Sequence, residues 1–195
     1  MTTSHHFATL LLVTSSNETA AQFAKMLPAE RFLPEFSVCI PREAEYVMSE
    51  DTYDVVVIDS TVPLADGRTI ASKASAHTEC NVLLLTAADC PEEIAGYAEK
   101  NGFMTLSMPV NPSLLKQSLS MMASMADRMH TLQDEADRLR QEMDDMRLIN
   151  RAKLILVQRF KMSEKDAHRF IEKNAMDRCV KKSIIAQGII RTYQN

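Results

Sequence analysis

Apolar runs and helical spacings alternate along the first 110 residues of the 195-residue chain. Five short and continuously apolar runs predict buried strands at residues 9–14, 36–40, 54–58, 81–85 and 103–107. Segments with helical spacing lie between them, at residues 18–27, 41–50, 66–76 and 91–101. Strands that are apolar throughout, rather than at alternate positions, are buried on both faces. The pattern therefore predicts an α/β domain with a doubly wound, five-stranded parallel sheet.

Between residues 115 and 150 the pattern changes to a seven-residue repeat. With Met122 as position a, the a series is Leu115, Met122, Met129, Ala136 and Met143, and the d series is Met125, Leu132, Leu139 and Met146. Asn111 and Pro112 suit the N-cap and first turn, and neither Pro nor Gly recurs before Gly188. A helix of these thirty-six residues would be roughly 54 Å long, which is too long for one small domain to cover.

The charges beside the apolar stripe indicate what covers it. Glu135 and Glu142 fall at g positions, and Arg140 and Arg147 fall at e positions. In a parallel coiled coil each glutamate would face an arginine of the second copy, which favours a homodimer. The residues expected at its interface are Met122, Met125, Met129, Leu132, Leu139, Met143 and Met146. The alternative is that the stripe packs against the chain's own domains.

A small all-α module of three helices is predicted after the repeat. Residues 151–159 continue the long helix, residues 160–162 form a turn, and further helices follow at 164–176 and 181–193. Ser163 suits an N-cap, with Asp166 three residues later as in a capping box. The expected organisation is an α/β domain at 1–112, a coiled-coil dimerisation helix at 113–150 and the three-helix module at 151–195.

Composition narrows the class of protein. No apolar run approaches the roughly eighteen residues of a membrane span, and the polar start is unlike a signal peptide, so we expect a cytoplasmic protein without a membrane partner. The cysteines, Cys39, Cys80, Cys90 and Cys179, show no CxxC spacing, so neither a disulfide framework nor a zinc site is expected. Without a Gly-rich phosphate loop, a metal cluster or a nucleophile beside a base, we expect no enzyme activity and no cofactor.

Charge is divided unevenly along the chain. Residues 151–195 contain eleven Lys/Arg and four Asp/Glu, a formal charge of 11 − 4 = +7. Because the whole chain carries −4, the remaining residues carry −4 − 7 = −11. A basic terminal module on an acidic body suggests a polyanionic partner, although a solvated charged surface would show the same balance.

The α/β domain resembles the receiver domain of two-component response regulators, a flavodoxin-like fold. The matching residues are Tyr53, the apolar third strand, Asp59, Pro63, the Asp66-Gly67 pair, and Thr86 at the end of the fourth strand. The resemblance implies that Asp59 occupies the phosphoacceptor position and Thr86 the hydroxyl position.

Several other receiver positions depart from that family. Receivers hold magnesium with an acidic pair after the first strand, because a hard cation needs carboxylate oxygens, and here the pair is Ser15 and Ser16. Met108 replaces the lysine that would neutralise the phosphoryl oxygens, and Thr105 replaces the aromatic switch residue. These departures predict a degenerate receiver in which Asp59 holds the loop at 60–67. Control would then come from a regulatory sensor partner or a small-molecule sensor instead of phosphorylation. The alternative is that Asp59 still accepts a phosphoryl group.

The C-terminal module resembles the ANTAR module, named from the AmiR and NasR transcription antitermination regulators. The matching positions are Ala152-Lys153, the aliphatic run 154–157, Ser163-Glu164 with Ala167, Ala175-Met176, Lys182 and Ile185-Ala186. ANTAR proteins bind stem-loops in nascent leader RNA and prevent a terminator hairpin, so the resemblance implies an RNA-binding antiterminator. The basic residues that can contact RNA are Arg151, Lys153, Arg159, Lys161, Arg178, Lys181 and Lys182.

Other interpretations of the module stay open. Phe160 and Phe170 have core spacing, so we expect them to be buried rather than to stack on bases, and we expect His168 at the surface. Lys161 and Lys165 suit solvated positions as well as RNA contacts. A basic three-helix module could also belong to a DNA-binding regulator, although its last helix is rich in isoleucine rather than polar residues. A third class is an interaction protein that binds no nucleic acid.

Overall fold

The computed structural model describes residues 7–32, 36–76, 80–88 and 93–193. The chain divides into two compact units, Met1–Thr131 and Leu132–Asn195. Cys90 and the first two residues of the helix predicted at 91–101 lie outside the described residues. Within the described part of the chain, no helix is both long enough and apolar enough to cross a membrane.

The first unit is built on a parallel sheet of five strands in the order β2-β1-β3-β4-β5. The strands are β1 (Leu10–Val13), β2 (Phe36–Cys39), β3 (Val55–Ile58), β4 (Asn81–Thr86) and β5 (Met104–Ser107). Every residue of β1 and β3 is buried, as expected for apolar strands that are covered on both faces. The predicted doubly wound fold is confirmed. Because β1 pairs with both β2 and β3, the strand order reverses there, and open α/β sheets bind ligands at such points.

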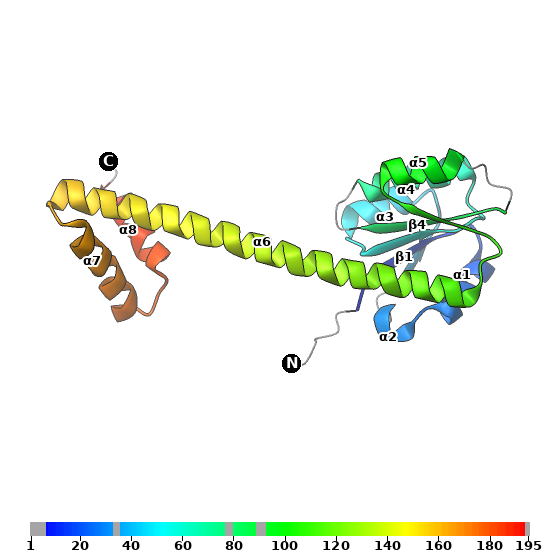
Figure 1. Ribbon diagram of the computed structural model, residues 1–195, viewed down its shortest axis with the longest axis horizontal. Coiled ribbons are helices and arrows are strands. Elements are labelled where there is room, and N and C mark those ends of the chain that lie inside the picture. The colour runs from blue at the N-terminus through cyan, green and yellow to red at the C-terminus, as the bar shows by residue number, and fades with distance from the viewer. Residues whose placement is uncertain (1–6, 33–35, 77–79, 89–92, 194–195) are drawn as a thin grey trace. The chain divides into compact units, whose positions relative to one another are not determined.

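Helices cover both faces of this sheet (Figure 1). They are α1 (Asn17–Met26), α2 (Ala29–Phe32), α3 (Ala44–Glu50), α4 (Leu64–Ser75), α5 (Glu93–Asn101) and the start of α6 (Pro112–Phe160). Phe23, Phe32 and Leu119 bring α1, α2 and α6 onto one face. Ile70 and Ala98 bring α4 and α5 onto the other. Helix α2 was not predicted from the sequence, because a single helical turn is too short to show a periodicity.

The first turns of α6 belong to the core of the α/β unit. Leu115, Leu119 and Met122 are buried there, and Met122 is 0% exposed. The assignment of Met122 to a dimer interface therefore has to be corrected, because the chain's own sheet already covers it. In these turns of α6 the apolar stripe packs against the chain's own domain, which was the alternative to a dimer interface.

Polar contacts hold the following turns of α6 against the same unit. Arg31 Nη2 lies 2.8 Å from Asp127 Oδ2, and His130 Nε2 lies 2.5 Å from Asp54 Oδ1. Asp54 is buried, and its other carboxylate oxygen accepts hydrogen bonds from Thr9 N at 2.7 Å and Thr9 Oγ1 at 3.0 Å. The boundary between the two units falls directly after these contacts, at residue 131 inside α6.

The second unit contains the rest of α6 together with α7 (Glu164–Asp177) and α8 (Lys182–Tyr193) (Figure 1). Its core joins the three helices through Ala152, Leu156, Ala167, Ile171, Ala175, Ile185, Ala186 and Ile189. Helix α7 begins as predicted, with Ser163 Oγ accepting a hydrogen bond from Asp166 N at 3.1 Å. The predicted three-helix arrangement at this end of the chain is confirmed.

Candidate functional site

Asp59 follows β3 at the point where the strand order reverses, and it is 2% exposed. Its Oδ2 accepts hydrogen bonds from Thr61 Oγ1 at 2.6 Å, Thr14 Oγ1 at 3.0 Å and Thr61 N at 3.3 Å. Its backbone carbonyl accepts one from Val62 N at 3.0 Å. These contacts satisfy the carboxylate within the protein and fix the beginning of the loop that follows β3.

The residues beside Asp59 differ from those expected from the receiver resemblance, which were Ser15 and Ser16. Ser16 Oγ accepts a hydrogen bond from a backbone N–H of α1 at 3.2 Å, so Ser16 is the N-cap of that helix. Ser15 is exposed, and its backbone N donates to Thr61 Oγ1 at 3.2 Å. The hydroxyls on Oδ2 of the carboxylate belong to Thr14 and Thr61, and Ser60 Oγ donates to Oδ1 at 3.5 Å. None of these contacts was predicted from the sequence. Only the pairing of β1 with β3 reveals that the residue after β1 lies beside Asp59.

The magnesium ion that the receiver resemblance implies does not fit these residues. Magnesium prefers octahedral oxygen ligands and is usually held by one or two carboxylates. Thr14 and Thr61 instead provide neutral hydroxyls that already donate to Asp59. Among the residues that the structure describes, no group of three or more His, Cys, Asp or Glu side chains could hold a metal. No reaction step through a metal is supported at this position.

The other receiver-like positions add no charge. Thr86 is buried at the end of β4, and its carbonyl accepts a hydrogen bond from Met108 N at 2.7 Å. The Met108 side chain packs against the apolar core. Thr105 lies partly buried within β5. A phosphoryl group at this end of the sheet would therefore find no cation at position 108, where the family supplies one.

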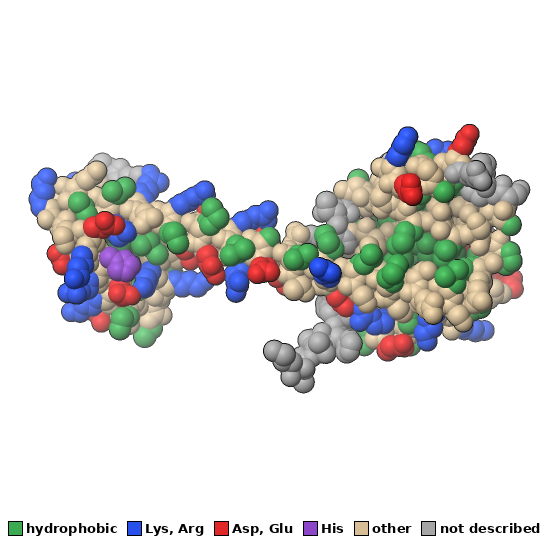
Figure 2. All heavy atoms as spheres, viewed as in Figure 1, with side chains coloured by type: hydrophobic (Ala, Val, Ile, Leu, Met, Phe, Trp, Pro, Cys, Tyr) green, Lys and Arg blue, Asp and Glu red, His purple; other side chains and the backbone are tan. Residues whose placement is uncertain are grey.

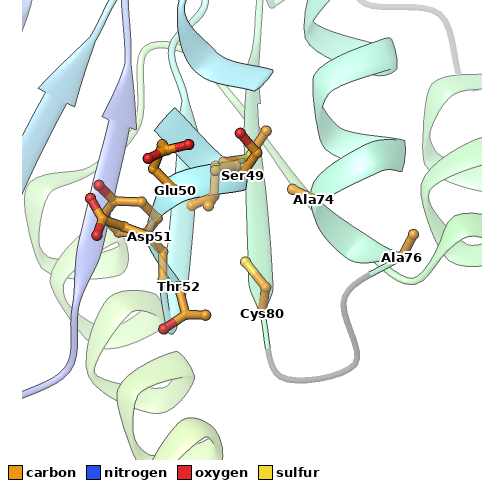
Figure 3. Close-up of a pocket in the computed structure, with 10 residues that line it drawn as sticks. Ser49, Glu50, Asp51, Thr52, Ala74, Ala76 and Cys80 are labelled. Carbon is orange, nitrogen blue, oxygen red and sulfur yellow. The ribbon is translucent and has the colours of Figure 1, made fainter. Parts of the chain in front are cut away.

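A hollow of about 640 Å³ lies near the amino ends of β3 and β4, beside the ends of α3 and α4 (Figure 3). Met48 and Tyr53 give it apolar walls, and Glu50 and Asp51 lie among its lining residues. It has carboxylates but no Lys or Arg among its described lining residues, so it does not suit a phosphate. Burial raises the pKa of the Cys80 thiol at its edge to about 12, which makes this thiol a poor nucleophile.

Lys and Arg side chains gather on the second unit (Figure 2). Three of the residues predicted to bind RNA already have partners in this unit. Lys153 Nζ donates to Glu164 Oε1 at 2.9 Å, and Lys182 Nζ donates to Glu172 Oε1 at 2.5 Å. Arg159 Nη1 donates to a backbone carbonyl of α8 at 2.8 Å. These three side chains thus also stabilise the module, whatever they contribute to a ligand.

The other four predicted residues are exposed: Arg151, Lys161, Arg178 and Lys181. No carboxylate within the described ranges forms an ion pair with any of them. Lys161 lies in the turn between α6 and α7, and Arg178 and Lys181 lie between α7 and α8. The turns of the module therefore present cations that are available to phosphate oxygens.

Two phenylalanines that the helical spacing assigned to the core are exposed instead. Phe160 is 48% exposed and Phe170 is 41% exposed, whereas Leu156 and Ile171 fill the core. The prediction was wrong because the apolar stripe of a helix can be wider than the face that its neighbours cover. His168 is exposed, as predicted.

The stripe on α6 stays open beyond Met122. The side chains of Met125, Met129, Leu132, Leu139, Met143 and Met146 are each between 38% and 64% exposed in the single chain. The predicted e-position arginines pair within the helix, Arg140 with Asp137 at 2.8 Å and Arg147 with Asp144 at 3.0 Å. These pairs compete with any pairing between chains. The apolar stripe, rather than its charged margins, is therefore the stronger indication of a partner.

Comparison with known proteins supports a separate assignment for each end of the chain. The model of the ANTAR domain family matches residues 137–190, from α6 to α8. The transcriptional regulatory protein PdtaR of Mycobacterium tuberculosis is 25% identical over 139 residues, which are 71% of this chain and 68% of that protein. The family match begins fourteen residues before position 151 and so includes part of α6 as well as the small helices.

Two solved structures with a similar fold are a signal receiver domain and a two-component transcriptional regulator. A signal receiver domain from Vibrio parahaemolyticus has a TM-score of 0.54 and 17% identity, and the match covers 65% of this chain and 98% of that one. The two-component transcriptional regulator AraC from Clostridium phytofermentans has a TM-score of 0.54 and 13% identity, covering 62% and 96%. At these identities the likeness concerns the fold alone.

Proposed function

This chain is an ANTAR regulator with a receiver-like domain at its N-terminal end, and we propose that it acts as an RNA-binding transcription antiterminator. The observation that carries the proposal is a coincidence of two features in one segment. The residues that match the ANTAR family also contain the exposed cations at the turns between α6, α7 and α8. Exposed cations at adjoining turns are suited to the phosphates of a folded RNA.

In the proposed mechanism the protein binds stem-loops in a nascent leader transcript and prevents a terminator hairpin from forming. Phosphates would be contacted directly by the four exposed cations without an ion pair in the described residues, namely Arg151, Lys161, Arg178 and Lys181. Proteins recognise RNA sequence mainly in single-stranded loops, where bases are accessible. The module would therefore read the loop while its cations hold the backbone.

We propose that the active form is a parallel homodimer joined through the exposed stripe of α6. Met125, Leu132, Leu139 and Met146 would meet the same residues of the second copy, which removes their apolar surface from water. A dimer presents two ANTAR modules. A leader with two closely spaced stem-loops should therefore bind more tightly than either stem-loop alone, since the second binding event is intramolecular.

We also propose that the receiver-like domain responds to a sensor partner rather than to a phosphoryl group. The Asp59 carboxylate is enclosed by the hydroxyls of Thr14 and Thr61, and Met108 supplies no positive charge. A phosphoryl group attached there would have to displace these hydrogen bonds without a metal or lysine to stabilise its oxygens. A signal transmitted by protein contact avoids that requirement.

The deciding experiment is a binding competition with the full-length protein. RNA recovered by crosslinking in cells supplies the probe, which is tested with two stem-loops, with each stem-loop alone, and as duplex DNA of the same sequence. We expect the tightest binding to the RNA with two stem-loops, weaker binding to a single stem-loop, and the weakest binding to duplex DNA. Equal affinity for duplex DNA would indicate a DNA-binding regulator, and retention of neither nucleic acid at moderate salt would indicate an interaction protein.

A further inference from the structure

A groove of about 690 Å³ opens in the second unit between the end of α6, α7 and α8. Its volume lies within the range of roughly 300–1,000 Å³ that is typical of ligand sites. The rings of Phe160, Phe170 and Tyr193 line it together with Arg178 and Arg191. Its described lining residues include no Asp or Glu. The groove therefore combines flat apolar surfaces with positive charge alone.

Two of the three aromatic rings are not used to close the core of the unit, whereas Tyr193 packs against it. Phe160 and Phe170 lie outside the cluster of buried residues that joins the three helices. Phe160 meets Tyr193 edge to face, with ring centroids 5.0 Å apart and planes at 81°. This contact helps to fix the orientation of both rings. Half-exposed rings gathered in one groove are typical of a binding surface rather than of an ordinary protein surface.

The charges around the groove limit what can occupy it. Arg178 caps the C-terminal end of α7, and Arg191 lies in the last turn of α8. Both are exposed, and neither forms an ion pair with a carboxylate in the described part of the chain. The Arg159 guanidinium lies 5.8 Å from the centroid of the Tyr193 ring and adds a third positive charge nearby. A second copy of this unit would bring the same charge, and an acidic peptide would not require flat rings.

We propose that the groove holds an unpaired base of single-stranded RNA, stacked on Phe170, with the neighbouring phosphates on Arg178 and Arg191. Phe160 and Tyr193, whose rings already contact each other, would form the adjoining wall. The inference rests on the proposed RNA-binding function and adds the chemical group that the module holds. Every base has a flat face, so such a site selects an unpaired nucleotide over a paired one before it selects a sequence.

The test begins with the full-length protein and a pool of RNA hairpins that share one stem and carry a randomised loop. The tightest-binding hairpin is then measured against Phe170→Leu, which keeps an apolar side chain but removes the ring. Loss of one base–aromatic stack should weaken binding roughly 5- to 150-fold. The salt dependence should not change, because no phosphate contact is lost. Phe7→Leu is the matched control, since Phe7 is 40% exposed but lies in the other unit.

Removal of single loop bases supplies the second arm. At the stacked position, an abasic nucleotide should weaken binding by the wild-type protein and cause no further loss with Phe170→Leu. Wild-type affinity of Phe170→Leu, or independent losses at every loop position, would refute the stacking site while RNA binding stands. Failure of the wild-type protein to select any hairpin would instead refute the proposed function.

Photocrosslinking of the selected hairpin to the wild-type protein makes the test independent of any variant. With halogenated uridine at each loop position, crosslinks to Phe160, Phe170 or Tyr193 support the groove. Crosslinks found only outside the groove would refute it, even if Phe170→Leu fails to fold.

Discussion

Replacing Leu132 and Leu139 together with glutamate should convert the protein to a monomer. In the single chain these leucines are 52% and 49% exposed, so about half of each side chain remains for a partner to bury. Full burial of a leucine is worth roughly 1.5–3 kcal/mol, so the remaining half is worth about 0.75–1.5 kcal/mol. A dimer buries four such side chains, which amounts to about 3–6 kcal/mol. The dissociation constant of the dimer should therefore rise by about two to four powers of ten.

Sedimentation velocity over a range of concentrations measures this change directly. The matched control is Thr131→Glu with Gln141→Glu, which adds the same charge to the same helix at positions outside the a and d series. That control should sediment as the wild-type protein does, and circular dichroism should show equal helix content in all three proteins. If the Leu132 and Leu139 double variant sediments with the mass of the wild-type dimer, the proposed interface is refuted. If the control dissociates as much as the leucine variant does, the added charge alone explains the effect.

Four further predictions concern other parts of the chain. Acetyl phosphate with magnesium should leave the protein mass unchanged, and a stable phosphoryl adduct on Asp59 would contradict the degenerate receiver. Lys181→Ala should lower the salt-dependence slope of RNA binding by about 0.7 per engaged module, whereas Lys182→Ala should change the slope less because its ammonium pairs with a glutamate. At about pH 8, alkylation followed by peptide mass spectrometry should modify the exposed Cys179 well before Cys80. Burial raises the pKa of Cys80 from 9.0 to about 12. Its neutral thiol therefore contributes stability that is fully present below pH 9.0 and is lost as the pH rises towards 12. The free energy of unfolding, measured in urea at a series of pH values, should follow this loss.

The sequence by itself determined the elements and the class of fold. Each strand is a continuous apolar run between polar turns, and such runs are stable only when both faces are covered. The start of α7 was also determined by local sequence, because the Ser163 hydroxyl accepts a hydrogen bond from a backbone N–H three residues away whatever surrounds the helix. The motifs at 151–190 also identified the ANTAR module, because their order and spacing follow the chain.

Only the tertiary structure decided what covers each apolar face. A seven-residue repeat shows that an apolar stripe exists, and Met122 and Leu132 belong to it equally. The sheet nevertheless buries Met122, whereas Leu132 remains about half exposed. Phe170 has core spacing, but the helices beside it cover Ile171 instead. Thr14 carries no signal of its own and lies on the Asp59 carboxylate because β1 pairs with β3. Periodicity records how a side chain points from its own helix or strand, whereas burial and hydrogen bonding depend on neighbours that are distant in the sequence.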